Sequence, residues 1–292
     1  ARVLKGKFER KNISLSSALK SLEIKLTKYD VIIVHGRSVL RDITEAGESA
    51  FRERSDYYKL FKEGARIDPR PLWVVDIIIH PKLGASKRSI PVRTSERANL
   101  RAKAKFKNVR LSGNIEKQFL YGMITGSELV PFGCLEPQLT VLPIPRTKTG
   151  YKIIKADEAR KMGFQGLAAW LKRVEHIWGE KLGKKSKNMT VYNWLDYWNQ
   201  LSSQNPNKRF KVLYNASGTY LVSCDLRNQK ISLRVDSLKV DINGVIADVT
   251  TYWMETDNED EAFYLSSFLN SPWIDEKIKL IQVHGAFGAR HI

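Results

Sequence analysis

Lysine and arginine are the residues of this chain most suited to chemistry, and nine of them fall within residues 87–110. Lysine and arginine side chains bind phosphate oxygens without reading a base sequence. Any one of them is ordinarily a solvated surface charge, so the prediction rests on their number. The sequence predicts a surface that contacts a nucleic-acid backbone, formed by Lys87, Arg88, Arg93, Arg97, Arg101, Lys103, Lys105, Lys107 and Arg110.

A second group of polar residues lies beside turns, where side chains can reach base edges. An arginine can form the paired hydrogen bonds that identify guanine. Glycines such as Gly218 and Gly288 let the backbone approach a ligand closely because no Cβ intervenes. We expect His291 to bind DNA and the following residues to approach its bases: Arg66, Arg70, Asn215, Ser217 and Arg290.

Catalytic patterns are missing from the sequence. An S-adenosylmethionine site needs a glycine-rich turn after a strand, and no segment has that context. The Asn/Asp-Pro-Pro-Tyr/Phe tetrad that holds an exocyclic amine is also absent, and Asn205-Pro206-Asn207 is interpreted as a turn. The five histidines lack paired ligand spacing, and Glu23-Ile24-Lys25 lacks the acidic partner of a nuclease site. We predict no catalytic residue, cofactor site or metal site.

Charge and cysteine content narrow the class of protein. Forty-nine basic residues oppose thirty-one acidic ones, a formal net charge of +18 that attracts polyanions. Cys134 and Cys224 stand ninety positions apart, so each is interpreted as an isolated buried thiol. No apolar run is long enough to span a bilayer and no signal segment opens the chain, which predicts a cytoplasmic protein without membrane contact. The opening Ala1 and the abrupt end suggest a fragment excised from a longer protein.

The elements that must position these residues fall into four stretches. Residues 1–45 contain a helical pattern over 15–22 and a strand over 31–34, and form an N-terminal extension or linker. Residues 46–150 form a β-rich lobe, with strands predicted over 72–79, 118–124 and 139–144 and a basic helix or loop over 97–107.

Residues 151–205 switch to helical spacing. One apolar stripe runs from Leu167 to Trp178, and a second helix capped by Thr190 runs on to Leu201. Their tryptophans are interpreted as helix–helix core. Residues 206–292 form a second β-rich lobe, with strands over 209–214, 219–225, 230–235 and 245–252, a turn over 215–218 and a closing helix from Asp260. The predicted fold is therefore α+β, with two β-rich lobes joined by a helical segment.

Four segments resemble adenine N-6 DNA methyltransferases of restriction–modification systems. Residues 64–73 resemble the G-A-x-I-x-P-R-x-L-W pattern of that family, and residues 212–219 resemble its V-x-Y-x-x-S-G segment. Residues 261–271 are similar to its E-A-x-Y-L-x-x-x-L-N-S helix, and residues 287–292 to its closing G-x-R-H-I. The four segments occur in the same order and span roughly residues 60–292.

The resemblance implies a target-recognition domain that clamps double-stranded DNA opposite a methyltransferase domain. That partner domain would bind S-adenosylmethionine, flip the adenine out of the helix and methylate it. The cofactor and Asn-Pro-Pro-Tyr segments are absent from this chain, so the resemblance carries over DNA binding and specificity but no catalysis. Two other classes stay open: a metal-dependent nuclease fragment whose carboxylates meet only in the fold, and an RNA-binding interaction module.

Overall fold

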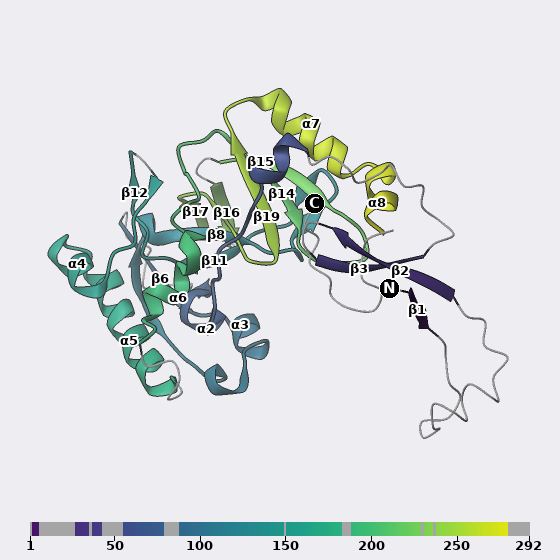
Figure 1. The fold of residues 1–292 in the computed structure, drawn as a ribbon. Coiled ribbons are helices and arrows are strands. Elements are labelled where there is room, and N and C mark those ends of the chain that lie inside the picture. The colour runs from purple at the N-terminus through teal and green to yellow at the C-terminus, as the bar shows by residue number, and fades with distance from the viewer. Residues whose placement is uncertain are drawn as a thin grey trace, which may run out of the picture. The chain divides into compact units, whose positions relative to one another are not determined.

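The chain forms two compact units in the computed structural model (Figure 1), one made of Ala1–Tyr58 with Ser271–Ile292 and the other of Lys59–Asn270. The smaller unit contains an antiparallel sheet of three strands and a helix. The structure describes residues 2–5, 27–34, 37–42, 55–78, 88–148, 150–182, 188–228, 231–235 and 238–279, and of 2–5, 27–34, 37–42, 233–235, 238–239 and 279 it describes the backbone alone.

In the smaller unit, β2 (Thr27–Val34) lies between β1 (Arg2–Lys5) and β3 (Arg37–Asp42). The strand predicted over 31–34 is confirmed within β2. The helix predicted over 15–22 lies outside the described residues. A short 3-10 helix, η1 (Asp56–Lys59), follows β3 in the chain, and α8 spans Pro272–Lys279.

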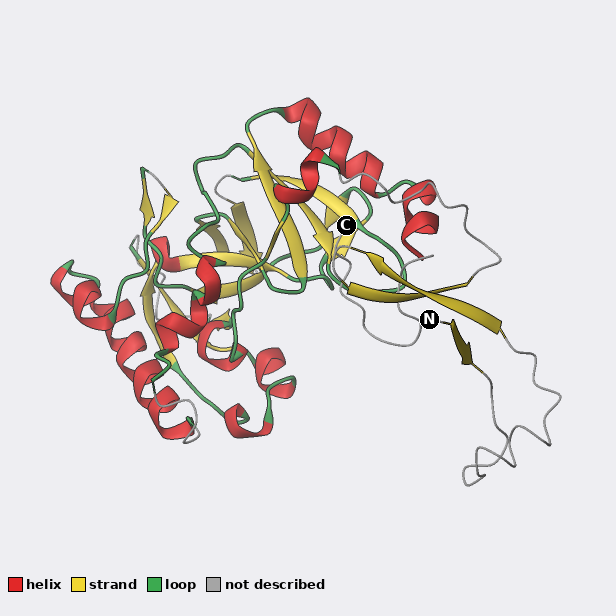
Figure 2. Ribbon diagram, in the orientation of Figure 1, coloured by secondary structure: helices red, strands yellow, loops and turns green. Residues whose placement is uncertain are grey.

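Lys59–Asn270 is an α+β unit with several small sheets (Figure 2). Strands distant in sequence share these sheets, because β4 joins β19 and β18 joins β8. The larger sheets are β15-β14-β19-β4, β11-β8-β18 and β5-β6-β7. Their bounds are β4 Lys62–Glu63, β5 Val75–Ile77, β6 Ser89–Thr94, β7 Ser112–Glu116, β8 Leu120–Ile124, β11 Gln138–Val141, β14 Phe210–Asn215, β15 Ser223–Arg227, β18 Val245–Ala247 and β19 Thr251–Thr256.

Short elements complete the unit. Three further pairs of strands are β9 (Leu129–Val130) with β10 (Gly133–Cys134), β12 (Arg146–Thr147) with β13 (Gly150–Tyr151), and β16 (Ile231–Val235) with β17 (Leu238–Ile242). The helices are α2 Arg70–Trp73, α3 Glu96–Leu100, η2 Ala104–Phe106, η3 Lys117–Phe119, α4 Ala156–Lys161, α5 Gln165–Lys181, α6 Val191–Leu195, η5 Tyr197–Asn199 and α7 Glu259–Leu269.

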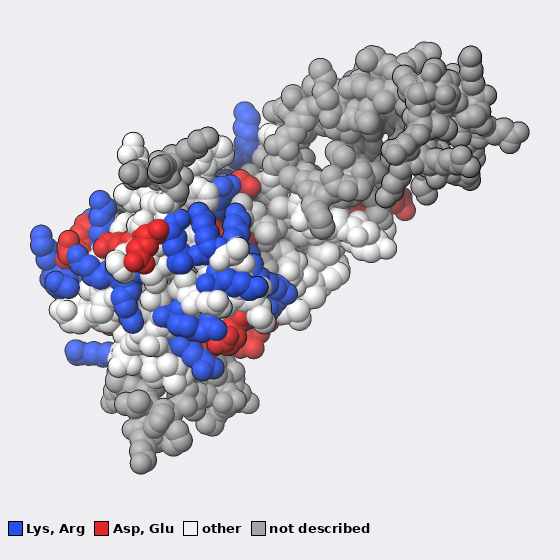
Figure 3. All heavy atoms as spheres, turned by 90° about the horizontal axis from the view of Figure 1, so that it is seen from below, with Lys and Arg blue, Asp and Glu red and all other residues white. Residues whose placement is uncertain are grey.

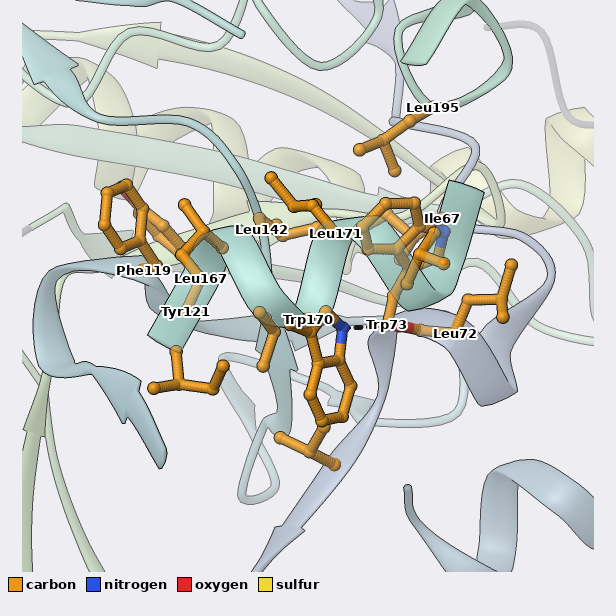
Figure 4. Close-up of a cluster of buried hydrophobic side chains, with 14 of the residues drawn as sticks. Ile67, Leu72, Trp73, Phe119, Tyr121, Leu142, Leu167, Trp170, Leu171 and Leu195 are labelled. Carbon is orange, nitrogen blue, oxygen red and sulfur yellow. Dashed lines mark hydrogen bonds between the residues drawn. The ribbon is translucent and has the colours of Figure 1, made fainter. Parts of the chain in front are cut away.

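The predicted helix over 167–178 is confirmed as α5, which packs its apolar stripe against β7. At its N-terminus, the Glu116 carboxylate accepts hydrogen bonds from the backbone N–H groups of Gly166 and Leu167, both at 2.9 Å. These are donors that a helix cannot satisfy internally. On the stripe, the fully buried Trp170 donates its indole N–H to the carbonyl of Leu72 at 3.1 Å (Figure 4). The core interpretation is confirmed for Trp170.

Two predicted helix starts are confirmed by their caps. The Thr190 hydroxyl accepts a hydrogen bond from the N–H of Asn193 at 3.1 Å, at the start of α6. The Asn258 side chain accepts from Asp260 and Glu261 at the start of α7. Side-chain oxygens at this position satisfy free N–H groups of the first turn. Helix α7 then packs against β14 and β15.

Several predicted elements differ from the structure. The strand predicted over 118–124 begins as the 3-10 helix η3, and the one predicted over 219–225 is a strand only from Ser223. Leu72 and Trp73 belong to the helical turn α2, where Pro71 suits the first turn of a helix, and the strand β5 spans only Val75–Ile77. The predicted strand over 245–252 is two strands, because the Asp248 carboxylate accepts hydrogen bonds from the N–H and hydroxyl of Thr250 and turns the chain. The second helix ends at Leu195 instead of Leu201.

The early end of α6 has a local cause. The Asp196 carboxylate accepts hydrogen bonds from the N–H groups of Leu201 and Ser202, at 3.0 and 2.9 Å, and so bends the chain into a turn. Trp198 takes a left-handed backbone conformation there, with φ of 54°, and its side chain is 77 % exposed. The core interpretation is therefore wrong for Trp198.

Candidate nucleic-acid interface

The basic segment predicted from the sequence is an exposed surface built on α3 and η2. The described cations of this segment are all exposed, and Figure 3 shows Lys and Arg side chains gathered on one face of the molecule. Helix α3 is only five residues long, and the chain turns at Arg101 before η2. Of the described cations, Arg97 and Arg101 lie in and directly after α3, and Lys103, Lys105 and Lys107 lie in and around η2. Arg88 precedes β6, Arg93 lies within it, and Arg110 precedes β7.

Only part of this charge is neutralised. Arg97 pairs with Glu128 at 3.5 Å, and Arg110 pairs with Glu96 at 3.4 Å. No carboxylate of the described residues forms an ion pair with the four cations Arg93, Arg101, Lys103 and Lys107. Cations without an internal partner are available to phosphates and lose no interaction within the fold when they bind.

A pocket of about 870 Å³ opens beside this surface. It combines four cations with one carboxylate, that of Asp68, and a wall of aromatic rings. Its lining residues come from separate parts of the chain: Asp68–Pro71 before and within α2, Arg101–Lys103 and Lys105–Phe106 around η2, Thr125–Ser127, Trp178 and Leu182 of the α5 end, Asn188 and Met189, Trp194 of α6, Ser217 and Thr250.

Three turns meet along one side of the pocket: the first contains Gly126, the second Thr250 and the third Asn215. The N–H of Gly126 donates to the Thr250 hydroxyl at 3.0 Å. A Cβ on Gly126 would lie 3.1 Å from the Thr250 carbonyl oxygen and 3.6 Å from the Cβ of Asn215, so the turns pack closely. The buried Glu128 carboxylate holds the first turn, because it accepts from the N–H and the hydroxyl of Thr125. The turns fix the positions of Ser127 and Ser217 at the pocket.

Arg66 and Arg70 are bound within the fold. The guanidinium of Arg66 lies over the rings of Trp194 and Tyr197, at 5.3 and 5.2 Å from their centroids. Arg70 pairs with the buried Asp248 at 3.3 Å. Burial raises the pKa of the Asp248 carboxyl, and the positive charge of Arg70 opposes that rise. Arg70 still lines the pocket, whereas Arg66 is not among its lining residues and contacts Trp194, which is.

Asn215 and Ser217 have different roles in the loop between β14 and β15. The Asn215 amide donates to the carbonyls of Ser217 and Tyr220, and its oxygen accepts from Val222, all at 2.9 Å. Asn215 therefore shapes the loop, while Ser217 lines the pocket. Gly218 has φ of +139°, a conformation that favours glycine.

Three predicted base- or phosphate-contacting residues lie outside the described residues: Lys87, Arg290 and His291.

Sequence reasoning missed the aromatic and neutral parts of the pocket. Trp178 and Trp194 were expected in the helix core because of their three- and four-residue spacing, and both do pack there. The same rings also face the pocket, together with Phe106. Periodicity cannot separate a core ring from one that also lines a cavity, because both lie on the buried side of the helix.

The two cysteines are neighbours. Cys224 is buried in β15, and the half-buried Cys134 packs against the same apolar cluster. A hydrogen bond joins the two thiols, which lowers the pKa of Cys134 and raises the pKa of Cys224. Their separation in sequence gave no sign of this contact.

Within the described residues, His, Cys, Asp and Glu side chains nowhere gather in a group of three or more that suits a metal ion. In the same part of the chain, every helix is too short or too polar to cross a membrane.

Comparisons with known proteins assign this chain to no family. No protein-family model matches the chain, and the curated proteins contain no match.

Proposed function

We propose that this chain binds double-stranded DNA sequence-specifically, as the target-recognition domain of an adenine N-6 DNA methyltransferase from a restriction–modification system. Its partner would be a methyltransferase domain that binds S-adenosylmethionine and carries the catalytic residues. In this proposal the chain itself has no catalytic role, and the complex works in the cytoplasm.

One observation carries the proposal: an exposed row of unpaired cations borders a pocket edged by polar turns. Arg101 directly follows α3, and Lys103 and Lys107 flank η2, where phosphates of a duplex can reach several at once. Such contacts position DNA, while polar groups on neighbouring turns reach base edges. Ser127 and Ser217 occupy that place here.

The test is the salt dependence of duplex binding. Fluorescence anisotropy with a labelled duplex measures the dissociation constant between low and moderate salt. Each phosphate contact contributes about 0.9 to the slope of log affinity against log salt, so contacts with Arg101, Lys103, Lys105 and Lys107 give a slope of about −3 to −4. Reversing the charge of Arg101, Lys103 and Lys105 together should remove most of the binding.

Lys208→Ala is the matched control, because the ammonium of Lys208 pairs with Asp257 at 2.6 Å and lies outside the pocket lining. Its slope should equal that of the unaltered chain. A flat salt dependence would contradict the proposal. Tighter binding of single-stranded RNA than of duplex DNA would replace it with the RNA-binding alternative, since single strands are bound by exposed aromatic stacking.

A further inference from the structure

A row of aromatic rings leads from the pocket to the surface. Phe106 stacks on Trp178 with centroids 6.1 Å apart, and Trp178 contacts Trp194 at 6.1 Å. The row continues through Tyr197, 6.0 Å from Trp194, to the exposed Trp198, 4.8 Å further on. The first three rings line the pocket. The row therefore offers aromatic surface both inside the pocket and outside it.

The wall of the pocket is held in a fixed orientation. The indole N–H of Trp178 donates to the carbonyl of Met189 at 2.8 Å. The guanidinium of Arg66 lies over the ring of Trp194 and over that of Tyr197, at 5.3 and 5.2 Å from their centroids. Rings that are already oriented lose little conformational freedom when a flat ligand stacks on them.

Cationic and neutral polar side chains lie at the edge of the same pocket, beside the aromatic wall. Arg101 and Lys103 form no ion pair with a described carboxylate, and Lys105 lies over the ring of Phe106 at 5.1 Å. Three neutral polar side chains at the pocket make no hydrogen bond to the described residues: Ser127, Asn188 and Ser217. Hydroxyl and amide groups of this kind both donate and accept, as base edges require.

We propose that the pocket binds one unstacked nucleotide, with its base on the indole wall and its phosphate on the cations of η2 and its flanks. The volume of about 870 Å³ lies within the range of about 300–1,000 Å³ for small-molecule pockets. Every base has a flat π-face, so stacking alone accepts any base. An extrahelical nucleotide of DNA and a free mononucleotide share this chemistry. The DNA form rests on the proposed duplex binding.

The experiment compares three probes with the full chain. The first is a labelled duplex, the second is the same duplex with a single bulged 2-aminopurine nucleotide, and the third is a set of deoxynucleoside monophosphates. The bulged duplex should bind about five- to a hundredfold more tightly than the paired one, which is the range of one base stacked on an aromatic ring. The fluorescence of the bulged 2-aminopurine should fall on binding as it stacks.

Two pocket variants and two controls separate binding from folding. Trp194→Ala should remove the preference for the bulged duplex and leave paired-duplex affinity unchanged, whereas Trp194→Phe should keep most of it. Ser127→Trp, on an exposed turn, should block the pocket without touching the core. Tyr264→Ala is the control, because Tyr264 is an aromatic residue on α7 that is 60 % exposed and outside the pocket lining.

The outcomes distinguish this inference from the proposed function. Equal affinity for both duplexes, or a preference that survives both pocket variants, overturns the nucleotide pocket while duplex binding stands. Mononucleotide binding that Trp194→Ala removes, without binding of either duplex, supports the pocket for a free nucleotide and overturns the proposed function. Absence of binding to all three probes overturns both.

Discussion

Lys211 and the lysines around η2 carry the same charge in opposite surroundings. The ammonium of Lys211 is 2 % exposed within β14 and donates to the Gln204 side chain at 2.8 Å and the Val245 carbonyl at 2.9 Å. It also pairs with Glu255 at 3.3 Å and lies 5.3 Å from the ring centroid of Trp253. Lys103, by contrast, is exposed and has no described ion-pair partner.

The difference shows how one residue type serves either the fold or a ligand. Burial lowers the pKa of Lys211, and Glu255 opposes that effect. A buried charge is tolerated only when its donors are satisfied, so all the interactions of Lys211 are used within the fold. Lys103 keeps its hydration and its donors, which makes it available to a phosphate at little cost to folding.

The largest expected effect is on stability, from Lys211→Ala. The substitution leaves the Glu255 carboxylate buried without its cation, although Asn205 still donates its N–H to it. Breaking a buried ion pair from one side costs about 3–5 kcal/mol. Urea unfolding followed by circular dichroism measures the free energy of unfolding. A loss below about 1 kcal/mol would mean that Lys211 is not structural, and the comparison would fail.

Arg70→Ala tests a cation that serves both the fold and the pocket, since Arg70 pairs with Asp248 and also lines the pocket. Removing it should cost about 1.5–3 kcal/mol at pH 7, the value of a hydrogen bond to a charged group. Because burial already raises the folded-state pKa of Asp248 and Arg70 opposes that rise, the variant raises it further. The destabilisation is present above the folded-state pKa, where the Asp248 carboxylate is ionised. It disappears in acid, where Asp248 is protonated in both the folded and the unfolded state.

Unfolding of Arg70→Ala is therefore measured at pH 7 and again in acid well below the ordinary carboxyl pKa of 3.8, beside the unaltered chain. A deficit of equal size at both pH values would show that Arg70 acts by packing alone. In that case Asp248 is not the reason for its position.

The exposed ion pair between Lys208 and Asp257 should have an intermediate effect on stability. Lys208 hydrogen-bonds Asp257 at 2.6 Å, which lowers the pKa of Asp257 below its ordinary value of 3.8. Stability gained in this way is present above the unfolded-state pKa and is lost as pH falls through the folded-state pKa. Lys208→Ala should lower the melting temperature slightly at neutral pH, with no difference from the unaltered chain in strong acid. A large drop at neutral pH would show that exposure is a poor guide to the role of a lysine.

The smallest stability effect is expected for Lys103→Ala, within about 0.5 kcal/mol of the unaltered chain. Its effect should appear in binding instead, as a salt slope for duplex DNA that is weaker by about one unit. Anisotropy titrations at several salt concentrations give that slope. An unchanged slope would remove Lys103 from the interface even if duplex binding itself is real.

Much of the secondary structure could be predicted from local signals. The stripe from Leu167 to Trp178 defines α5, and the caps Thr190 and Asn258 define the starts of α6 and α7. Each signal involves residues within a few positions of one another, so the sequence displays it directly. Side-chain hydrogen bonds that redirect the chain, such as those of Asp196 and Asp248, were missed because a turn of this kind has no periodicity.

The sequence by itself determined the strong positive charge, the basic segment between Lys87 and Arg110, the α5 helix and the Thr190 cap, because these depend on composition or on neighbours along the chain. Only the tertiary structure decided which cations are free. Lys211 sits in a strand whose every residue is buried, and no local pattern distinguishes it from Lys103. The pocket likewise joins segments as distant as Asp68 and Thr250, and such a site exists only after the strands pair and the turns meet.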